Sequence, residues 1–149
     1  MINKLPLTLV VDASILFSFF NIGSERRRII EELPHRGTRL VVPKYAFEEL
    51  ISDKERVLKY GKINEQMFAF LLSIIESKID SFSKEEYIKY LSDAHSLSPH
   101  EDSKKDDPYF ALALSLNCAI WSDEKAFKEQ SKIKIFSTEE LIKLLSSKK

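Results

Sequence analysis

Short apolar runs alternate with amphipathic stretches along the chain. Residues 7–12 form a short run rich in Leu and β-branched residues, without the alternation of a half-exposed strand, which indicates a strand buried on both faces of a parallel sheet. Similar runs at 39–42, 118–121 (CAIW) and 133–136 (IKIF) predict further strands, and IDSF at 79–82 predicts a short link or strand.

The segments between these runs carry apolar residues at helical spacing. Ser83 with Glu86 and Ser137 with Glu140 fit capping boxes, and Ser14 fits the cap of the first helix. In chain order the pattern predicts helices over 14–20, 24–33, 46–60, 63–78, 83–91 and 108–117, a final helix from 137, and a loop over 92–105.

This alternation predicts an α/β fold, a three-layer sandwich with a mostly parallel central sheet flanked by helices. The 149 residues suit a single domain over 1–149, long enough to bury about two thirds of the unfolded surface. Asp12 interrupts the run LTLVVDASILFSFF, so no stretch reaches the roughly 20 apolar residues of a membrane span. The leader before this run is short and weakly basic, and we therefore expect a cytoplasmic protein.

The cysteine and the histidines limit the kinds of metal site and catalysis that the sequence supports. Cys118 stands among apolar neighbours and fits a core position better than a reactive thiol. His35, His95 and His100 lack ligand spacing, which weighs against zinc and against a histidine-assisted nucleophile. A metal ion in this protein would therefore be bound by oxygen atoms.

Positive charge is local rather than global. Lys plus Arg and Asp plus Glu both number 23, so the net charge of zero gives no overall field that attracts nucleic acid. Clustered basic side chains fit either solvated faces or contacts with a nucleic-acid backbone. They are Arg26, Arg27, Arg28, Lys104, Lys105 and Lys125.

Acidic residues follow the predicted strands or begin the helices after them. The carboxyl ends of parallel strands share one edge of the sheet, and ligands of α/β folds bind there. Carboxylates crowded at this edge raise each other's pKa values unless a hard cation such as Mg²⁺ or Mn²⁺ neutralises them. The sequence therefore indicates a metal site with the candidates Asp12, Glu49, Asp106, Asp107, Asp123 and Glu124.

Each acid also has a structural interpretation. Asp12 could cap the helix after it, and one of Glu48 and Glu49 is expected to be solvated. Asp107 directly precedes a proline, the favoured first residue of a helix, and is interpreted as the cap of that helix. Asp106 then remains as the metal ligand of the pair.

Four blocks of the sequence carry a family resemblance. VVDAS, VVPKYAFEEL, DDPYFALALSL and IWSDEKAF together resemble the PIN-domain family of metal-dependent ribonucleases, which includes VapC-type toxins and stand-alone archaeal relatives. No block is specific alone, but the four occur in the family's order and spacing between Leu9 and about Phe136. The resemblance implies a single PIN-like nuclease domain.

The resemblance also implies roles for individual residues. Asp12 matches the first aspartate of the family, and Ser14 matches its small polar companion. Glu49 matches the helix acid in the family's Glu-Leu step, with the glutamate before it as a weaker choice. Asp106 matches the aspartate two residues before the proline, with Asp107 as an adjacent rival.

The last block departs from the family pattern. The family usually shows Trp, Ser or Thr, any residue, and then Asp, whereas here Trp121, Ser122 and Asp123 are followed by Glu124. Either acid can supply oxygen to a metal, and the sequence leaves open which of the two does so. Ser122 would orient a ligand or a water molecule.

The implied activity is that of an endoribonuclease that hydrolyses RNA phosphodiester bonds with Mg²⁺ or Mn²⁺. Single-stranded RNA is the expected substrate, and RNA rather than DNA rests on the resemblance alone. A toxin–antitoxin role, an antitoxin protein as partner and a homodimer are further expectations from relatives. The alternative is a non-catalytic PIN-like module that binds RNA or protein, for which Glu124 is the sequence support.

Overall fold

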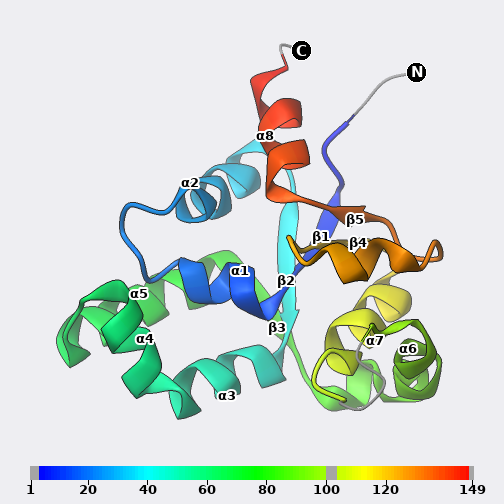
Figure 1. Cartoon of the computed structure of the whole chain (residues 1–149), viewed down its shortest axis with the longest axis horizontal. Helices are drawn as coiled ribbons and strands as arrows, with labels where there is room; N and C mark the ends of the chain where they lie inside the picture. The colour runs from blue at the N-terminus through cyan, green and yellow to red at the C-terminus, as the bar shows by residue number, and fades with distance from the viewer. Residues whose placement is uncertain (1–3, 100–103, 148–149) are drawn as a thin grey trace.

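The computed structural model of the protein describes residues 4–99 and 104–147. Within these residues five strands form one sheet in the order β3-β2-β1-β4-β5, and every neighbouring pair is parallel (Figure 1). The strands are β1 (Thr8–Val11), β2 (Arg39–Pro43), β3 (Ile79–Phe82), β4 (Ala119–Trp121) and β5 (Ile135–Phe136). The predicted α/β sandwich is confirmed.

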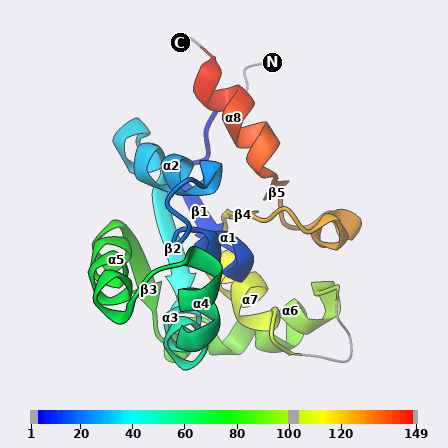
Figure 2. The ribbon, with the colours of Figure 1, turned by 60° about the vertical axis from the view of Figure 1, so that its left-hand side comes forward.

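Helices flank this sheet. They are α1 (Ala13–Ser18), α2 (Glu25–Glu32), α3 (Lys44–Ser52), α4 (Lys54–Gly61), α5 (Glu65–Lys78), α6 (Leu91–Leu97), α7 (Asp107–Leu116) and α8 (Thr138–Ser146). Helix α7 contacts β1, β2 and β4, whereas α5 contacts β3 and lies on the opposite side of the strands from α7 in Figure 2. No helix within the described ranges is long and apolar enough to cross a membrane.

The order of the strands creates a switch point between β1 and β4. From β1 the chain adds β2 and β3 on one side, then returns to place β4 and β5 on the other side. Val11 pairs with Trp121, and the backbone N–H of Asp12 donates to the Trp121 carbonyl at 3.0 Å. Residues that follow β1 and β4 therefore leave the sheet side by side, at the point where α/β folds bind ligands.

Two of the predicted helices were wrong in detail. The helix expected over 46–60 is divided at Asp53 into α3 and α4. The segment expected as one helix over 83–91 forms two short 3₁₀ turns, Lys84–Glu86 and Ile88–Tyr90, and the Ser83 side chain caps neither of them. Tyr87 between them is only 3% exposed, so packing of its ring prevails over local helix preference.

The loop expected over 92–105 was also partly wrong, because α6 occupies its first part. The apolar signal of α6 is weak, since Ala94 is its one buried residue. Residues 100–103 of the expected loop lie outside the described residues. By contrast, the capping box of Ser137 and Glu140 is confirmed at the start of α8.

Gly61 ends α4 where that helix meets the chain after α1. A Cβ atom on Gly61 would lie 2.3 Å from the backbone oxygen of Phe20, far inside contact distance. The glycine therefore permits a close approach of α4 to this segment. On the same side, Arg56 and Tyr60 of α4 contact Phe17 of α1.

We predict that Gly61→Ala lowers the free energy of unfolding by about 1–3 kcal/mol, because the gain in helix preference is smaller than the cost of moving the backbone. Gly23→Ala is the matched control, since its nearest contact would be Asn21 Oδ1 at 3.9 Å. Urea unfolding measures both variants. Similar unfolding midpoints for the two would contradict the tight contact at Gly61.

Candidate metal centre

Asp12 lies at the switch point and is 5% exposed. Its Oδ1 accepts a hydrogen bond from the Ala13 backbone N–H at 2.8 Å, which makes Asp12 the cap of α1 in place of Ser14. Its Oδ2 accepts hydrogen bonds from the hydroxyls of Ser122 at 2.8 Å and Ser14 at 3.3 Å. Capping and a place in the site are therefore compatible roles for this carboxylate.

The electrostatic surroundings of Asp12 favour a nearby cation. Burial raises the pKa of Asp12 above its ordinary value, and the charge of Glu124 raises it further. Hydrogen bonds from Ser122, Ala13 and Ser14 lower the pKa but do not offset the burial. A cation at this position would offset both the lost hydration and the repulsion from Glu124.

Three carboxylates from different parts of the chain act on one buried hydroxyl, that of Tyr109 in α7. Tyr109 is 1% exposed, and its Oη has no hydrogen-bond partner among the described residues. Burial raises its pKa well above 10, and the charges of Glu49, Asp12 and Asp106 each raise it further. The three carboxylates therefore lie near enough to the Tyr109 hydroxyl for their charges to act on it.

A cavity of about 320 Å³ lies beside Tyr109. Glu49 lines it from α3, and the hydroxyl of Tyr45 donates to Glu49 Oε2 at 2.7 Å. Burial raises the pKa of Tyr45 to about 12, together with the bond to Glu49 and the charge of Asp106. The cavity lining includes Ser14, Phe17, Glu49, Lys105, Asp106 and Tyr109.

The adjacent aspartates of α7 face different cavities. Asp106 lines the cavity that contains Glu49 and Tyr109. Asp107 lines a second cavity of about 790 Å³, where its carboxylate oxygens lie 2.9 and 3.2 Å from Nδ1 of His95. The expectation that Asp107 caps α7 was wrong, because it is the first helical residue and its carboxylate pairs with His95.

The side chains of Asp123 and Glu124 have different surroundings. Asp123 accepts hydrogen bonds from the backbone N–H of Thr138 at 2.6 Å and from its hydroxyl at 2.5 Å, and it pairs with Arg26 at 2.7 Å. Glu124 instead acts on Asp12 through its charge, and its backbone N–H donates to Ser122 Oγ at 3.1 Å. The contacts of Asp123 hold parts of the fold together. Glu124 is the acid of this pair whose charge raises the pKa of Asp12.

The three arginine side chains of α2 contact other side chains of the protein. Arg26 pairs with Asp123, and Arg27 lies over the Phe19 ring with its side chain only 15% exposed. Arg28 pairs with Glu25 at 2.6 Å. These contacts weigh against a role in RNA binding, at least for the first two arginines. Lys104, Lys105 and Lys125 are exposed, and Lys105 lines the cavity of the carboxylates.

The sequence did not single out the tyrosines of the site. Tyr109 is the aromatic residue after Pro108 in DDPYF, and Tyr45 lies four residues before Glu49, one helical turn away. Both signals were present in the sequence. The convergence of charge on a buried hydroxyl required the structure.

The donor chemistry of the site fits a hard divalent cation, since all of its candidate ligands are oxygen atoms. In the part of the chain that the structure describes, no three Asp, Glu, His or Cys side chains are grouped closely enough to hold an ion directly. Mg²⁺ usually keeps several waters and takes one or two carboxylates, with substrate phosphates as further ligands. A more open group of carboxylates is compatible with that mode of binding.

An α/β fold with carboxylates at the switch point of a parallel sheet defines a class of metal-assisted enzymes and related binding modules. A family model described as a PIN domain matches residues 10–145. The protein therefore belongs to the PIN-domain family, as the four sequence blocks indicated. PIN domains are commonly nucleases, generally use divalent metals and generally bind RNA. A comparison with curated proteins gave no match.

We predict opposite effects for the two adjacent acids after β4. Asp123→Asn is expected to lower the free energy of unfolding by about 1–3 kcal/mol at pH 7, because it weakens hydrogen bonds to a charged group. Glu124→Gln is expected to leave stability unchanged or slightly raised, because it removes repulsion from Asp12. Urea unfolding compares them, and equal losses would contradict the separation of their roles.

The pH dependence follows from the direction of the pKa shift. Burial raises the pKa of Asp123, but the hydrogen bonds from Thr138 and Arg26 outweigh it and lower the pKa below the ordinary value of 3.8. Its stabilising contribution is therefore present above that value and is lost as the pH falls through the folded pKa. The deficit of Asp123→Asn should shrink in acid.

We further predict that Tyr109→Phe raises the unfolding midpoint in metal-free buffer, because it removes a buried hydroxyl that has no described partner. Tyr45→Phe is the matched control and should lower the midpoint, because it removes the bond to Glu49. Thermal unfolding with EDTA tests the pair. A loss of stability in Tyr109→Phe as large as that in Tyr45→Phe would show that the Tyr109 hydroxyl is satisfied.

Proposed function

We propose that this protein is a metal-dependent endoribonuclease in which Asp12, Glu49, Asp106 and Glu124 hold Mg²⁺ or Mn²⁺. The observation that carries this proposal is that Glu49 and Asp106 line one cavity with the buried hydroxyl of Tyr109, on which the charge of Asp12 also acts. The three carboxylates come from the end of β1, from α3 and from the start of α7. Two carboxylates that line one cavity, with the buried carboxylate of Asp12 at the adjacent strand end, resemble a cation site more than a structural ion pair.

The residues of the chain have distinct tasks in this proposal. The hydroxyls of Ser14 and Ser122 fix Oδ2 of Asp12, and the backbone of Ala13 fixes Oδ1. Tyr45 fixes Glu49 in the same way. A divalent cation bound by these carboxylates would favour ionisation of water and offset negative charge on the phosphate.

Protonation of Asp12 competes with the cation. Because burial and Glu124 raise its pKa, Asp12 takes up a proton at higher pH than an exposed aspartate does. Metal affinity is therefore expected to decrease as the pH is lowered through the raised pKa of Asp12.

The absence of a catalytic serine, cysteine or histidine constellation among the residues that line the cavity accords with attack by water.

Single-stranded RNA is the substrate that we propose. The cavity has a volume of about 320 Å³, and such a site accepts an accessible backbone more readily than a paired duplex. Lys105 lines its opening and is placed for contact with phosphate, with Lys104 and Lys125 as weaker candidates.

A toxin role, an antitoxin partner and a homodimer remain predictions. Helix α5 buries Phe68, Leu71 and Ile75 in the core but leaves Met67 37% and Phe70 58% exposed. These two are the large apolar side chains that α5 exposes, and a partner could cover them.

A non-catalytic PIN-like binding module is the second candidate. The observation that favours it is that no three potential metal ligands in the described ranges are grouped closely enough to hold an ion directly. Such a module would bind RNA without cutting it. The cleavage experiment that follows distinguishes this module from the nuclease.

We predict that the purified protein cuts labelled mixed-sequence single-stranded RNA with Mn²⁺ or Mg²⁺ and not with EDTA. Asp12→Asn and Asp106→Asn should each reduce the rate at least about 100-fold, because each removes a carboxylate from the proposed cation site. The rate is measured from gel-resolved products at several metal concentrations.

Glu48→Gln is the matched control for these variants, because Glu48 is exposed and lines the second cavity. It should cut at nearly the wild-type rate. Cleavage that continues in EDTA, or is equal in wild type and both aspartate variants, would rule out the proposed site. RNA binding without cleavage would support the binding module.

A further inference from the structure

An aromatic pair lies at the mouth of the carboxylate cavity. Phe17 of α1 lines the cavity and is half-buried, and its ring centroid lies 4.8 Å from that of Tyr60 in α4, with the planes tilted by 46°. Tyr60 is 42% exposed. Phe17 therefore brings aromatic surface to the cavity that Glu49 and Asp106 line, and the ring of Tyr60 next to it is open to solvent.

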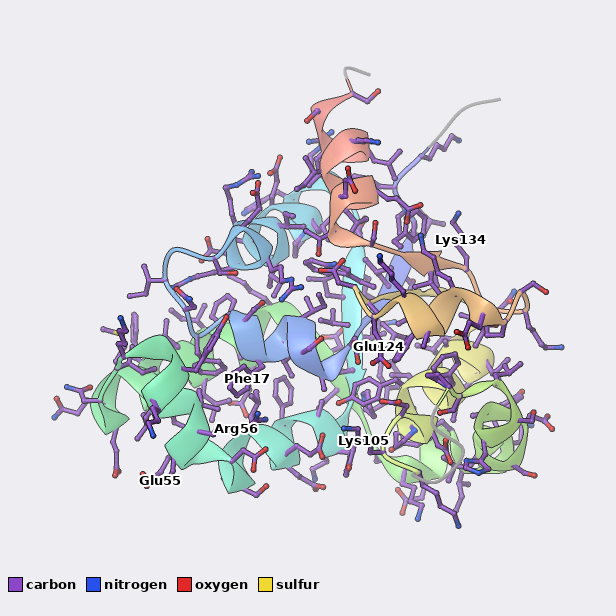
Figure 3. All side chains as sticks on the ribbon, viewed as in Figure 1. Phe17, Glu55, Arg56, Lys105, Glu124 and Lys134 are labelled. Atoms are coloured by element: carbon purple, nitrogen blue, oxygen red, sulfur yellow. The ribbon has the colours of Figure 1, made fainter. Side chains whose placement is uncertain are left out.

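Arg56 extends this surface. Its guanidinium carbon lies 4.8 Å from the centroid of the Phe17 ring, and Figure 3 shows the two side chains together below α1. The Arg56 side chain is 71% exposed, and its ion pair with Asp53 is long, at 3.5 Å. Arg56 also lines the cavity. A cation in this position is stacked on an aromatic ring and only weakly neutralised.

Two other arginines lie over aromatic rings, but their contacts are with groups of the fold outside the cavity. Arg39 lies over Phe82 at 5.3 Å, but it also pairs with Asp80 at 2.7 Å. Arg27 lies over Phe19, which is fully buried. The stack of Arg56 on Phe17 differs because its ion pair is long and because both residues line the cavity of the proposed cleavage site.

The cavity has the stack at one side and Lys105 at another. Both Arg56 and Lys105 line it, and Figure 3 shows Lys105 and Glu124 displaced from Phe17 and Arg56 toward α7. A strand whose phosphate lies at the carboxylates and their cation would therefore extend a neighbouring nucleotide onto the stack. Aromatic faces with arginine are how proteins bind unpaired bases without reading sequence.

We propose that Phe17, Tyr60 and Arg56 form a stacking subsite for an unpaired base of single-stranded RNA next to the phosphate that is cut. The exposed ring of Tyr60 and the planar guanidinium of Arg56 contact the base, and the Phe17 ring under Arg56 holds both in place. This subsite rests on the proposed function, because it places the flanking nucleotide relative to the carboxylates. It also explains how a chain of zero net charge holds RNA, through local stacking and two cations.

The test measures binding rather than cleavage. Fluorescence anisotropy gives the Kd of a labelled RNA decamer and of the same backbone with stable abasic spacers, in EDTA and again with Ca²⁺. Wild type should bind the decamer with bases at least about 5-fold more tightly than the abasic one. Phe17→Leu and Tyr60→Leu should reduce this ratio toward 1, because they keep apolar bulk but remove the aromatic face.

Arg56→Lys keeps the charge but removes the planar guanidinium, and it should also lower the ratio. Arg39→Lys is its matched control, because Arg39 stacks on Phe82 outside the cavity, and it should leave the ratio unchanged. Thermal unfolding of each variant separates loss of the fold from loss of the subsite, and Tyr60→Leu changes an exposed residue.

A wild-type ratio near 1, no binding under either condition, or an unchanged ratio in all three subsite variants would overturn the subsite. Failure of the proposed function looks different, because a base-dependent ratio would persist while no metal supports cleavage. Cleavage that depends on Asp12 and Asp106, together with a ratio unaffected by Phe17, Tyr60 and Arg56, would leave the nuclease in place and remove only the subsite.

Discussion

The hydrogen bond from Ser122 to Asp12 joins the two strand ends on which the site depends. Asp12 follows β1 and Ser122 follows β4. Their side-chain oxygens lie 2.8 Å apart at the switch point between these strands. Because the two strands are parallel neighbours in fixed register, this bond forms as a consequence of the fold. It satisfies one oxygen of a buried carboxylate that water would otherwise solvate. The other residues of the proposed cation site lie around this carboxylate.

The site concentrates negative charge that a stable fold alone would avoid. Burial and Glu124 both oppose ionisation of Asp12, and three carboxylates act on a tyrosine hydroxyl that has no hydrogen-bond partner in the described ranges. Asp123 and Asp107 each have a basic side chain beside them, Arg26 and His95 respectively. Functional sites commonly store unfavourable electrostatics of this kind, since the ligand restores the balance. Of the acids that we assign to the cation, Asp12 and Glu49 instead accept hydrogen bonds from hydroxyl and backbone donors.

The central strands could be predicted from the sequence because β1, β2 and β4 are buried and leave short, mainly apolar runs, whereas β3, with two exposed positions, was expected only as a link or strand. The candidate acids could be selected from the sequence for a related reason, since parallel strands bring their carboxyl ends to one edge. The roles of adjacent acids could not be predicted in this way. One residue of register decides whether a carboxylate meets His95 or lines the cavity with Glu49, and only packing sets that register. Helix α6 escaped prediction because it buries little apolar surface.

The most direct test of the central claim is the position of a bound metal. In crystals of the protein soaked with Mn²⁺, anomalous diffraction should show an ion among the carboxylates of Asp12, Glu49 and Asp106, beside the hydroxyl of Tyr109. Ligation through water or by only some of these carboxylates would agree with the open grouping seen here. Full occupancy at another site with none here, or no ion at millimolar Mn²⁺, would contradict the claim that these carboxylates form a cation site.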